Sequence, residues 1–101
     1  MKEIYLFKLV TGETIIAEQL RVEELNPKTG AKGHILKNPY VVPPKFLERH
    51  EKIYPWLPLN DITKMEIPLP QQYVIAIFEE QVVNVHVMGE YLDNVLRDTL
   101  N

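Results

Sequence analysis

The sequence predicts a mainly β protein: a small, five-stranded, strongly bent antiparallel barrel followed by a C-terminal helix. Three features indicate this class: short apolar runs rich in β-branched residues, prolines and turn residues between them, and one amphipathic segment near the end. The chain of 101 residues, 46% of them hydrophobic, suffices for one small core. We therefore expect a single domain over residues 1–101, with strands within about 3–78 and the helix within about 80–99.

The first two strands are predicted to form a hairpin. Residues 4–10 are apolar at both alternating sets of positions, which is typical of a strand covered on both faces. Residues 11–13 are few enough for a tight turn, and Gly12 can adopt the positive φ that such a turn needs. A long second strand, residues 14–25, then pairs antiparallel with the first.

The middle of the chain is marked by turn residues and prolines. An exposed loop is predicted for residues 26–33 and a third strand for residues 34–42, with Pro39 at an edge, a bend or a bulge. Residues 45–53 fit either a short helix or a long hairpin tip. The hairpin is favoured, because residues 54–59 resume a strand-like pattern that their prolines make irregular.

The last predicted strand, residues 73–78, is the clean apolar run YVIAIF. Residues 81–88 after it have two interpretations: a strand, because Val83, Val85 and Val87 alternate with polar residues, or a helix. The helix is favoured because apolar residues continue at steps of three and four as far as Leu96. Such a helix can cover the outer face of the first strand.

The composition argues against an enzyme and against a metal or cofactor site. The chain contains no cysteine and no serine, so the common nucleophiles are missing, and its three histidines are far apart in sequence. We expect no catalytic residue, no metal and no cofactor. No run of 18 apolar residues and no signal-peptide pattern are present, so we expect a cytoplasmic protein without a membrane partner.

Positive charge is concentrated in the middle of the chain. Residues 1–27 carry three basic and five acidic side chains, residues 28–52 six and two, and residues 53–101 two and seven. The three segments thus have net charges of -2, +4 and -5. Residues 28–52, which we call the positive block, have two interpretations. They form either an ordinary solvated surface or a surface that binds phosphate.

The sequence resembles the Sm-like family, most of all the small Sm-like proteins of marine phage and environmental sequences. The opening of the first Sm motif, a leucine, a turn glycine and a β-branched pair, is matched by Leu9, Gly12, Ile15 and Ile16. Asn38 takes the place of the asparagine in that motif, ahead of an apolar stretch that begins at Tyr40. His34 then falls at the acidic position and Lys37 at the position that stacks on a base.

The second Sm motif has arginine–glycine or lysine–histidine just before the last strand, where this chain has Gln71 and Gln72, followed by Tyr73. The resemblance implies a homo-oligomeric ring whose subunits pair through the edges of their sheets. It also implies a pore-facing site for RNA or single-stranded DNA, made of donors with Tyr40 or Tyr73 as a stacking platform. The candidate residues are Lys28, Lys32, Lys37, Asn38, Tyr40, Gln71, Gln72 and Tyr73.

Two functions are therefore open. The first is an Sm-like ring that binds RNA or single-stranded nucleic acid as an adaptor. The second is a structural or protein-interaction module on the same scaffold that binds a protein partner and no nucleic acid. It is indicated by the glutamines at the second motif, which supply no charge to a phosphate, and by the acidic C-terminal half.

Overall fold

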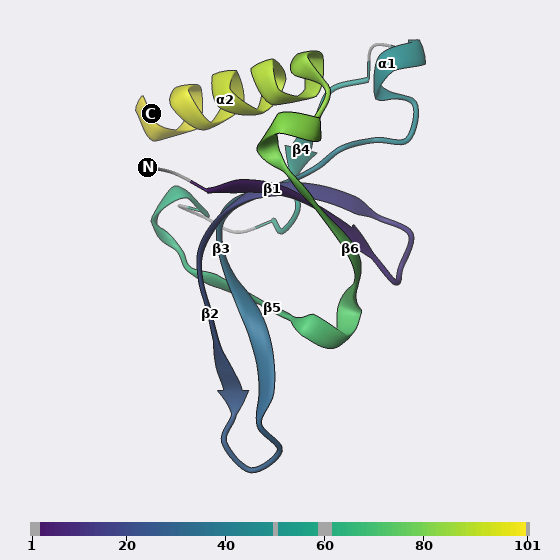
Figure 1. Cartoon of the computed structure of the whole chain (residues 1–101). Coiled ribbons are helices and arrows are strands. Elements are labelled where there is room, and N and C mark those ends of the chain that lie inside the picture. Colours follow the sequence, from purple (N-terminus) through teal and green to yellow (C-terminus); the bar gives the residue numbers. More distant parts are fainter. Residues whose placement is uncertain (1–2, 50, 59–61, 101) are drawn as a thin grey trace.

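The computed structural model describes residues 3–49, 51–58 and 62–100. In these ranges six antiparallel strands form one sheet, and a C-terminal helix lies across it (Figure 1). The elements are β1 (Ile4–Leu9), β2 (Thr14–Asn26), β3 (Ala31–Val41), α1 (Phe46–Arg49), β4 (Tyr54–Pro55), η1 (Ile62–Lys64), β5 (Ile67–Pro70), η2 (Gln71–Tyr73), β6 (Val74–Glu79), η3 (Glu80–Val82) and α2 (Val85–Leu100). The predicted class, a mainly β fold with a C-terminal helix, is confirmed.

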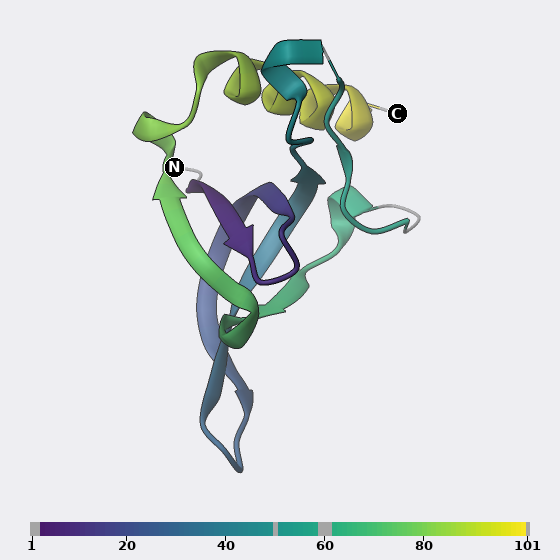
Figure 2. The same cartoon turned by 90° about the vertical axis from the view of Figure 1, so that its right-hand side faces the viewer.

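The hairpin predicted near the N-terminus is present. β1 pairs antiparallel with β2, with Phe7 opposite Ile15. The amide of Leu9 donates to the carbonyl of Glu13 over 2.9 Å, and Gly12 has a φ of 95°. A glycine is needed at this position because a side chain strongly disfavours that backbone conformation. The following hairpin, β2–β3, is longer and projects from the body of the protein (Figures 1 and 2).

The predicted number of five strands is wrong, because the described residues contain six. The additional strand is β5, whose sequence IPLP contains two prolines. β5 pairs with β3 through the register Ile67↔Leu36 and Leu69↔His34, so the two residues that have an N–H alternate with Pro68 and Pro70. A proline is tolerated in a strand where its missing N–H faces away from the partner strand. Only the edge of β5 that faces β3 can therefore both donate and accept backbone hydrogen bonds.

The predicted barrel is not closed. The order of the sheet is β4-β3-β2-β1-β6, with β5 on the part of β3 that β4 does not cover. β5 and β6 follow each other in the chain across η2, but no ladder joins them among the described residues. The sheet instead curves around its inner face and stays open between these two strands (Figure 2). Pro68 and Pro70 give a reason, since they leave no N–H donor on the free edge of β5.

Residues 45–53 also differ from the prediction that favoured a hairpin tip. Phe46–Arg49 form α1, one helical turn in which the amide of Arg49 donates to the carbonyl of Lys45 over 2.8 Å. The strands on either side of this connection, β3 and β4, do pair antiparallel, with Val41 opposite Tyr54. The two alternatives are thus combined: a short helix lies inside the connection of a hairpin.

The tail is helical, as the favoured interpretation had it, but α2 begins at Val85 rather than near residue 80. Asn84 explains this start, because its Oδ1 accepts the amide of His86 over 2.8 Å and its carbonyl accepts the amide of Met88 over 3.0 Å. These bonds are those of an N-cap residue. The predicted start was too early because the apolar spacing that predicts the helix does not locate its N-cap.

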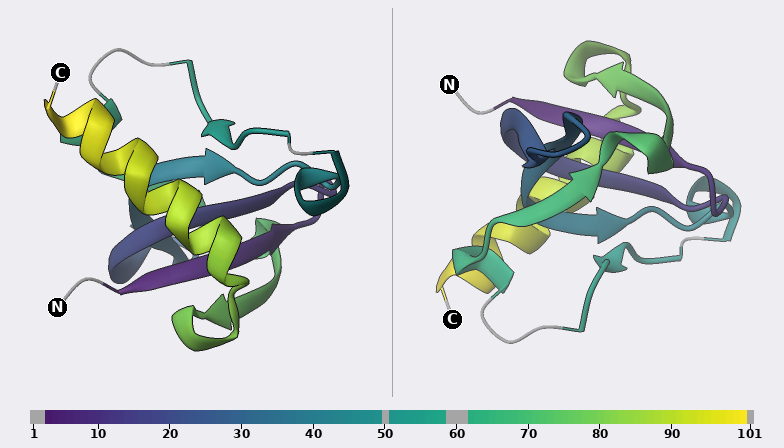
Figure 3. Two further views of the ribbon diagram at one scale, coloured as in Figure 1. Left: turned by 90° about the horizontal axis from the view of Figure 1, so that it is seen from above. Right: turned by 90° about the horizontal axis from the view of Figure 1, so that it is seen from below.

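Apolar side chains fill both faces of the sheet, as predicted for the first strand. The inner core, on the concave face, consists of Phe7, Leu9, Ile15, Ala17, Leu36, Val41 and Leu69, with Trp56 packed against it. The helix-side core lies between the other face and α2 and consists of Ile4, Ile16, Tyr40, Ile53, Val87 and Tyr91. Figure 3 shows α2 crossing β1, β2 and β3 on that side.

One buried histidine makes stability depend on pH. His34 Nδ1 lies 2.7 Å from Gln19 Oε1, its Nε2 has no partner among the described residues, and burial lowers the pKa of the imidazole. The unfolded chain therefore binds a proton at His34 at a higher pH than the folded protein does. We expect the free energy of unfolding to fall as pH drops below about 6.5, the ordinary histidine pKa.

Urea denaturation at several pH values between 5 and 8 measures this dependence. The slope should be smaller in His34→Gln than in the wild type. An unchanged slope in His34→Gln would contradict the assignment.

Candidate nucleic-acid interface

A groove lies between the tip of the β2–β3 hairpin and η2, and its volume is about 530 Å³. We call it the tip groove. The residues that line it are Leu25, Asn26, Thr29, Ala31, Lys32, Pro70, Gln71 and Gln72. Figure 2 shows the tip of the hairpin and the short helix η2 on the same lower part of the molecule. The long hairpin thus brings residues near position 30 beside residues near position 71.

The shape of the hairpin tip is fixed by its own side chains. Asn26 Oδ1 accepts the amide of Lys28 over 3.0 Å, and Thr29 Oγ1 accepts the amide of Ala31 over 3.2 Å. Gly30 has a φ of 73°, and its amide donates to the carbonyl of Asn26 over 2.8 Å. Such local bonds are typical of asparagine and threonine in turns. The tip therefore presents Lys28 and Lys32 on a defined turn.

The charge at the tip groove is positive but moderate. Arg21, further along β2, lies 2.7 Å from both Glu23 and Glu66, so two carboxylates neutralise it. Lys28 and Lys32 make no ion pair within 4.0 Å among the described residues, although Glu24 is opposite Lys32 in the β2–β3 register. The two lysines remain free to bind an anion.

On the η2 side, the groove offers amides and an adjacent aromatic ring. Gln71 and Gln72 are exposed and provide amide donors and acceptors without charge. Tyr73 follows them and is 45% exposed, and its carbonyl accepts the amide of Val10 over 2.9 Å. This bond fixes the end of η2 to the end of β1. Sites for single-stranded nucleic acid commonly combine amides, which bond to base edges, with an exposed aromatic side chain on which a base stacks.

Three of the predicted site residues lie elsewhere. Lys37 is half-buried on β3, opposite Glu18. Asn38 and Tyr40 are buried on the same strand beneath α2, where Tyr91 Oη donates to the carbonyl of Asn38 over 3.0 Å. The structure therefore gathers Lys32, Gln71 and Gln72, with Lys28 and Tyr73 next to them, and separates the other three.

Asn38 and Tyr40 have structural contacts instead. Asn38 has a φ of 53°, in the left-handed region that asparagine tolerates better than most residues, at an irregular point of β3. The hydroxyl of Tyr40 donates to Asp98 of α2, and burial together with this carboxylate raises the pKa of that hydroxyl. Both residues attach the C-terminal helix to the sheet.

Asn26 and Thr29 line the tip groove but were not among the predicted site residues. Their signal was present in the turn sequence NPKTG, where both residue types commonly bond to the backbone. Leu25 and Pro70 gave no such signal, because their proximity depends on β5 pairing with β3.

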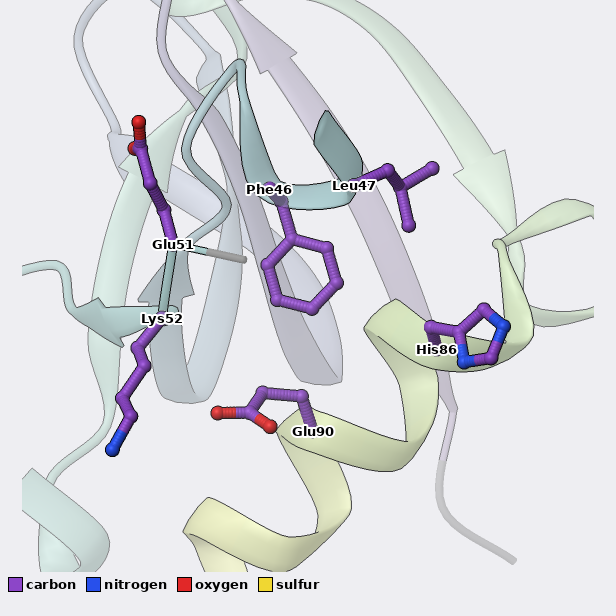
Figure 4. A pocket seen from close by; sticks show the side chains of 6 residues that line it. All are labelled: Phe46, Leu47, Glu51, Lys52, His86 and Glu90. Carbon is purple, nitrogen blue, oxygen red and sulfur yellow. The ribbon is translucent and has the colours of Figure 1, made fainter. Parts of the chain in front are cut away.

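A second hollow, of about 430 Å³, lies between α1 and the first turns of α2 (Figure 4). Its lining residues are Phe46, Leu47, Glu51, Lys52, His86 and Glu90. Charges of both signs surround the apolar floor, so they favour no single class of ligand. In the described part of the chain, no cluster of three histidine, aspartate or glutamate side chains could hold a metal ion.

No helix in the described ranges is both long enough and apolar enough to cross a bilayer. Comparison with known protein families and with curated proteins finds no match for this sequence.

Proposed function

We propose that the protein is an Sm-like oligomeric adaptor that binds single-stranded nucleic acid, RNA or DNA, at the tip groove. The observation that supports this function is the meeting of Lys32 with Gln71 and Gln72, from segments about forty residues apart, beside Lys28 and Tyr73. In this proposal the lysines bind phosphates, the glutamines bond to base edges and Tyr73 stacks on a base.

The free edges of the sheet support the Sm-like assembly. β6 has one partner, β1, and its other edge is open among the described residues, with Ile75 63% and Ile77 42% exposed along it. Exposed apolar edge strands are sites of strand-to-strand pairing between chains. The free edge of β5 carries carbonyl acceptors but no donors at Pro68 and Pro70. Those carbonyls can accept N–H groups from β6 of the next copy, so a β6–β5 pairing between copies would have hydrogen bonds in one direction only. Such a pairing is a head-to-tail contact, which generates a ring when the rotation between copies closes.

Binding of labelled oligo-U and oligo-A at several salt concentrations tests the nucleic-acid function. We expect the double variant Lys28→Ala/Lys32→Ala to bind about tenfold more weakly and to show a salt slope lower by about 1.4, which corresponds to two lost phosphate contacts on a single strand. The matched control is Lys45→Ala/Lys52→Ala, which removes two charges from the same positive block near α1. Wild-type protein that does not bind at micromolar concentration and low salt, or an equal loss in both double variants, would overturn the proposal.

A second candidate function is a protein-interaction module without nucleic-acid binding. The uncharged Gln71 and Gln72 and the exposed apolar residues of β6 favour it. The same titration separates the two functions, because this module would not retain an oligonucleotide at low salt.

A further inference from the structure

The C-terminal helix α2 has a second apolar face that points away from the sheet. Its buried face contributes Val87 and Tyr91 to the helix-side core. On the opposite side, Val85 is 76%, Leu92 45% and Leu96 60% exposed. The left view of Figure 3 shows no described element lying over the helix on this side. We call the residues Val85, Gly89, Leu92 and Leu96 the outer stripe.

The spacing of the outer stripe is that of a helix-pairing seam. Its members follow each other at steps of four, three and four residues, so they form one line along the helix. This is the alternation of the a and d positions of a heptad repeat, which is buried when two helices pack along their length. A solvated helix needs no apolar residue on this face.

The borders of the outer stripe indicate that its occupant is a second copy of the same helix. His86 and Asp93 are exposed along one border, seven residues apart. Met88 and Val95 lie along the other border, where they are half-buried against the helix-side core. When two copies pack antiparallel, each border meets the same border of the partner. His86 then faces Asp93 of the other copy, twice, and Met88 faces Val95, twice. A parallel pair would instead place the polar border against the apolar one.

Gly89 provides space at the centre of such a pair. A Cβ built on Gly89 would meet nothing within 4 Å, so the space above this point of the helix is open. An antiparallel pair centred between Gly89 and Leu92 places Leu92 of each copy over Gly89 of the other. The end layers then pair Val85 with Leu96. The helix dipoles also oppose each other, which is favourable.

We propose that two copies of the protein associate through the outer stripes of their α2 helices, packed antiparallel about a two-fold axis. This contact uses neither the strand edges nor the tip groove. The association therefore goes beyond the proposed function. If copies form a ring through β5 and β6, the α2 contact would join two such rings. If they form no ring, it would produce a dimer.

The mass of the particle in solution tests the association. Light scattering should give a mass for the double variant Leu92→Glu/Leu96→Glu that is half the wild-type mass at the same concentration, because four like charges would be brought into one seam. The control Leu20→Glu/Val22→Glu introduces the same two charges at exposed apolar residues of β2 and should keep the wild-type mass. An equal mass for the double variant and the wild type, with both folded by circular dichroism, would overturn the proposal.

Cross-linking tests the antiparallel orientation. Because the chain has no cysteine of its own, only the introduced cysteines can form a disulfide. Val85→Cys and Leu96→Cys chains, mixed and oxidised, should give the mixed disulfide dimer, since these residues share a layer within disulfide reach. Each variant alone should stay uncross-linked. Dimers in either single variant, or none in the mixture, would contradict the arrangement.

The outcomes also separate this contact from the strand-edge assembly. The amide of Leu9 donates on the β2 side, so by alternation Phe7 also faces β2, and Ile77, opposite Phe7, turns its N–H to the free edge of β6. Ile77→Pro removes this N–H, so it should reduce a doubled ring to an α2-linked dimer while the mixed disulfide still forms. If the mass of Ile77→Pro equals that of the wild type, the ring is wrong and the α2 contact stands on the cross-linking result.

Discussion

Replacing Tyr91 by alanine is expected to lower the free energy of unfolding by about 3–5 kcal/mol, the range for truncation of a buried aromatic residue. The ring of Tyr91 is buried at the centre of the helix-side core and packs edge-on against Tyr40, with centroids 5.7 Å apart. Its hydroxyl donates to the carbonyl of Asn38 over 3.0 Å. Truncation leaves a cavity and removes the contacts of Tyr91 with Tyr40 and Asn38 of β3.

Two further variants separate the contribution of the buried ring from that of the hydrogen bond. Tyr91→Phe keeps the ring and loses only the hydrogen bond, so it should cost about 1 kcal/mol. Tyr54→Ala makes the same truncation at a tyrosine that is 51% exposed and should cost clearly less than Tyr91→Ala. Urea denaturation followed by circular dichroism, at one fixed protein concentration, measures all three. A loss below about 1 kcal/mol in Tyr91→Ala would show that α2 does not depend on this contact.

The elements that could be predicted from the sequence are those whose signals are local. The first hairpin needs only an apolar run, a three-residue turn with Gly12 and a second apolar run, and all three are adjacent in the chain. The tail could be assigned to a helix because its apolar spacing continues over several turns. Its exact start could not, because the apolar spacing does not identify Asn84 as the N-cap residue.

Elements that depend on distant partners were missed. The segment IPLP has a proline at every second position, which argues against a strand when it is considered alone. It is a strand because β3 supplies a partner on the one side where Ile67 and Leu69 can bond. Likewise, the single turn of α1 is too short for a periodic pattern to distinguish it from a loop.

The candidate site was predicted only in part, because it too depends on contacts between segments far apart in the sequence. Lys32, Gln71 and Gln72 do line one groove. Both segments lie at the ends of predicted strands, and the Sm-like resemblance implies that these ends are close in space. Asn38 and Tyr40 were placed at the site by motif position alone. Their burial under α2 follows from the long register of β3, which a short motif does not specify.

Replacing Gly33 by valine is expected to cost about 3 kcal/mol, at the upper end of the usual range for overpacking. Gly33 lies where β2, β3 and β5 come together. A Cβ at this position would lie 2.3 Å from Leu25 Cδ1 and 3.0 Å from the carbonyl oxygen of Leu69. The leucine side chain can rotate away, but the backbone of β5 has to shift, and Pro70, opposite Gly33 in the register, shifts with it. The variant should therefore lose stability and also distort the tip groove, which Leu25 and Pro70 line.

A double-mutant cycle identifies the cause. Gly33→Ala should cost about 1–3 kcal/mol in the wild-type background and less in a Leu25→Ala background, where the nearest obstructing side chain is gone. The remaining cost then measures the contact with the Leu69 carbonyl, which no side-chain change relieves. Equal costs in both backgrounds would show that Leu25 is not the obstacle. A negligible cost for Gly33→Val would show that β5 does not approach β3 as closely as its register requires, and the tip groove would lose the wall that Pro70 and Gln71 provide.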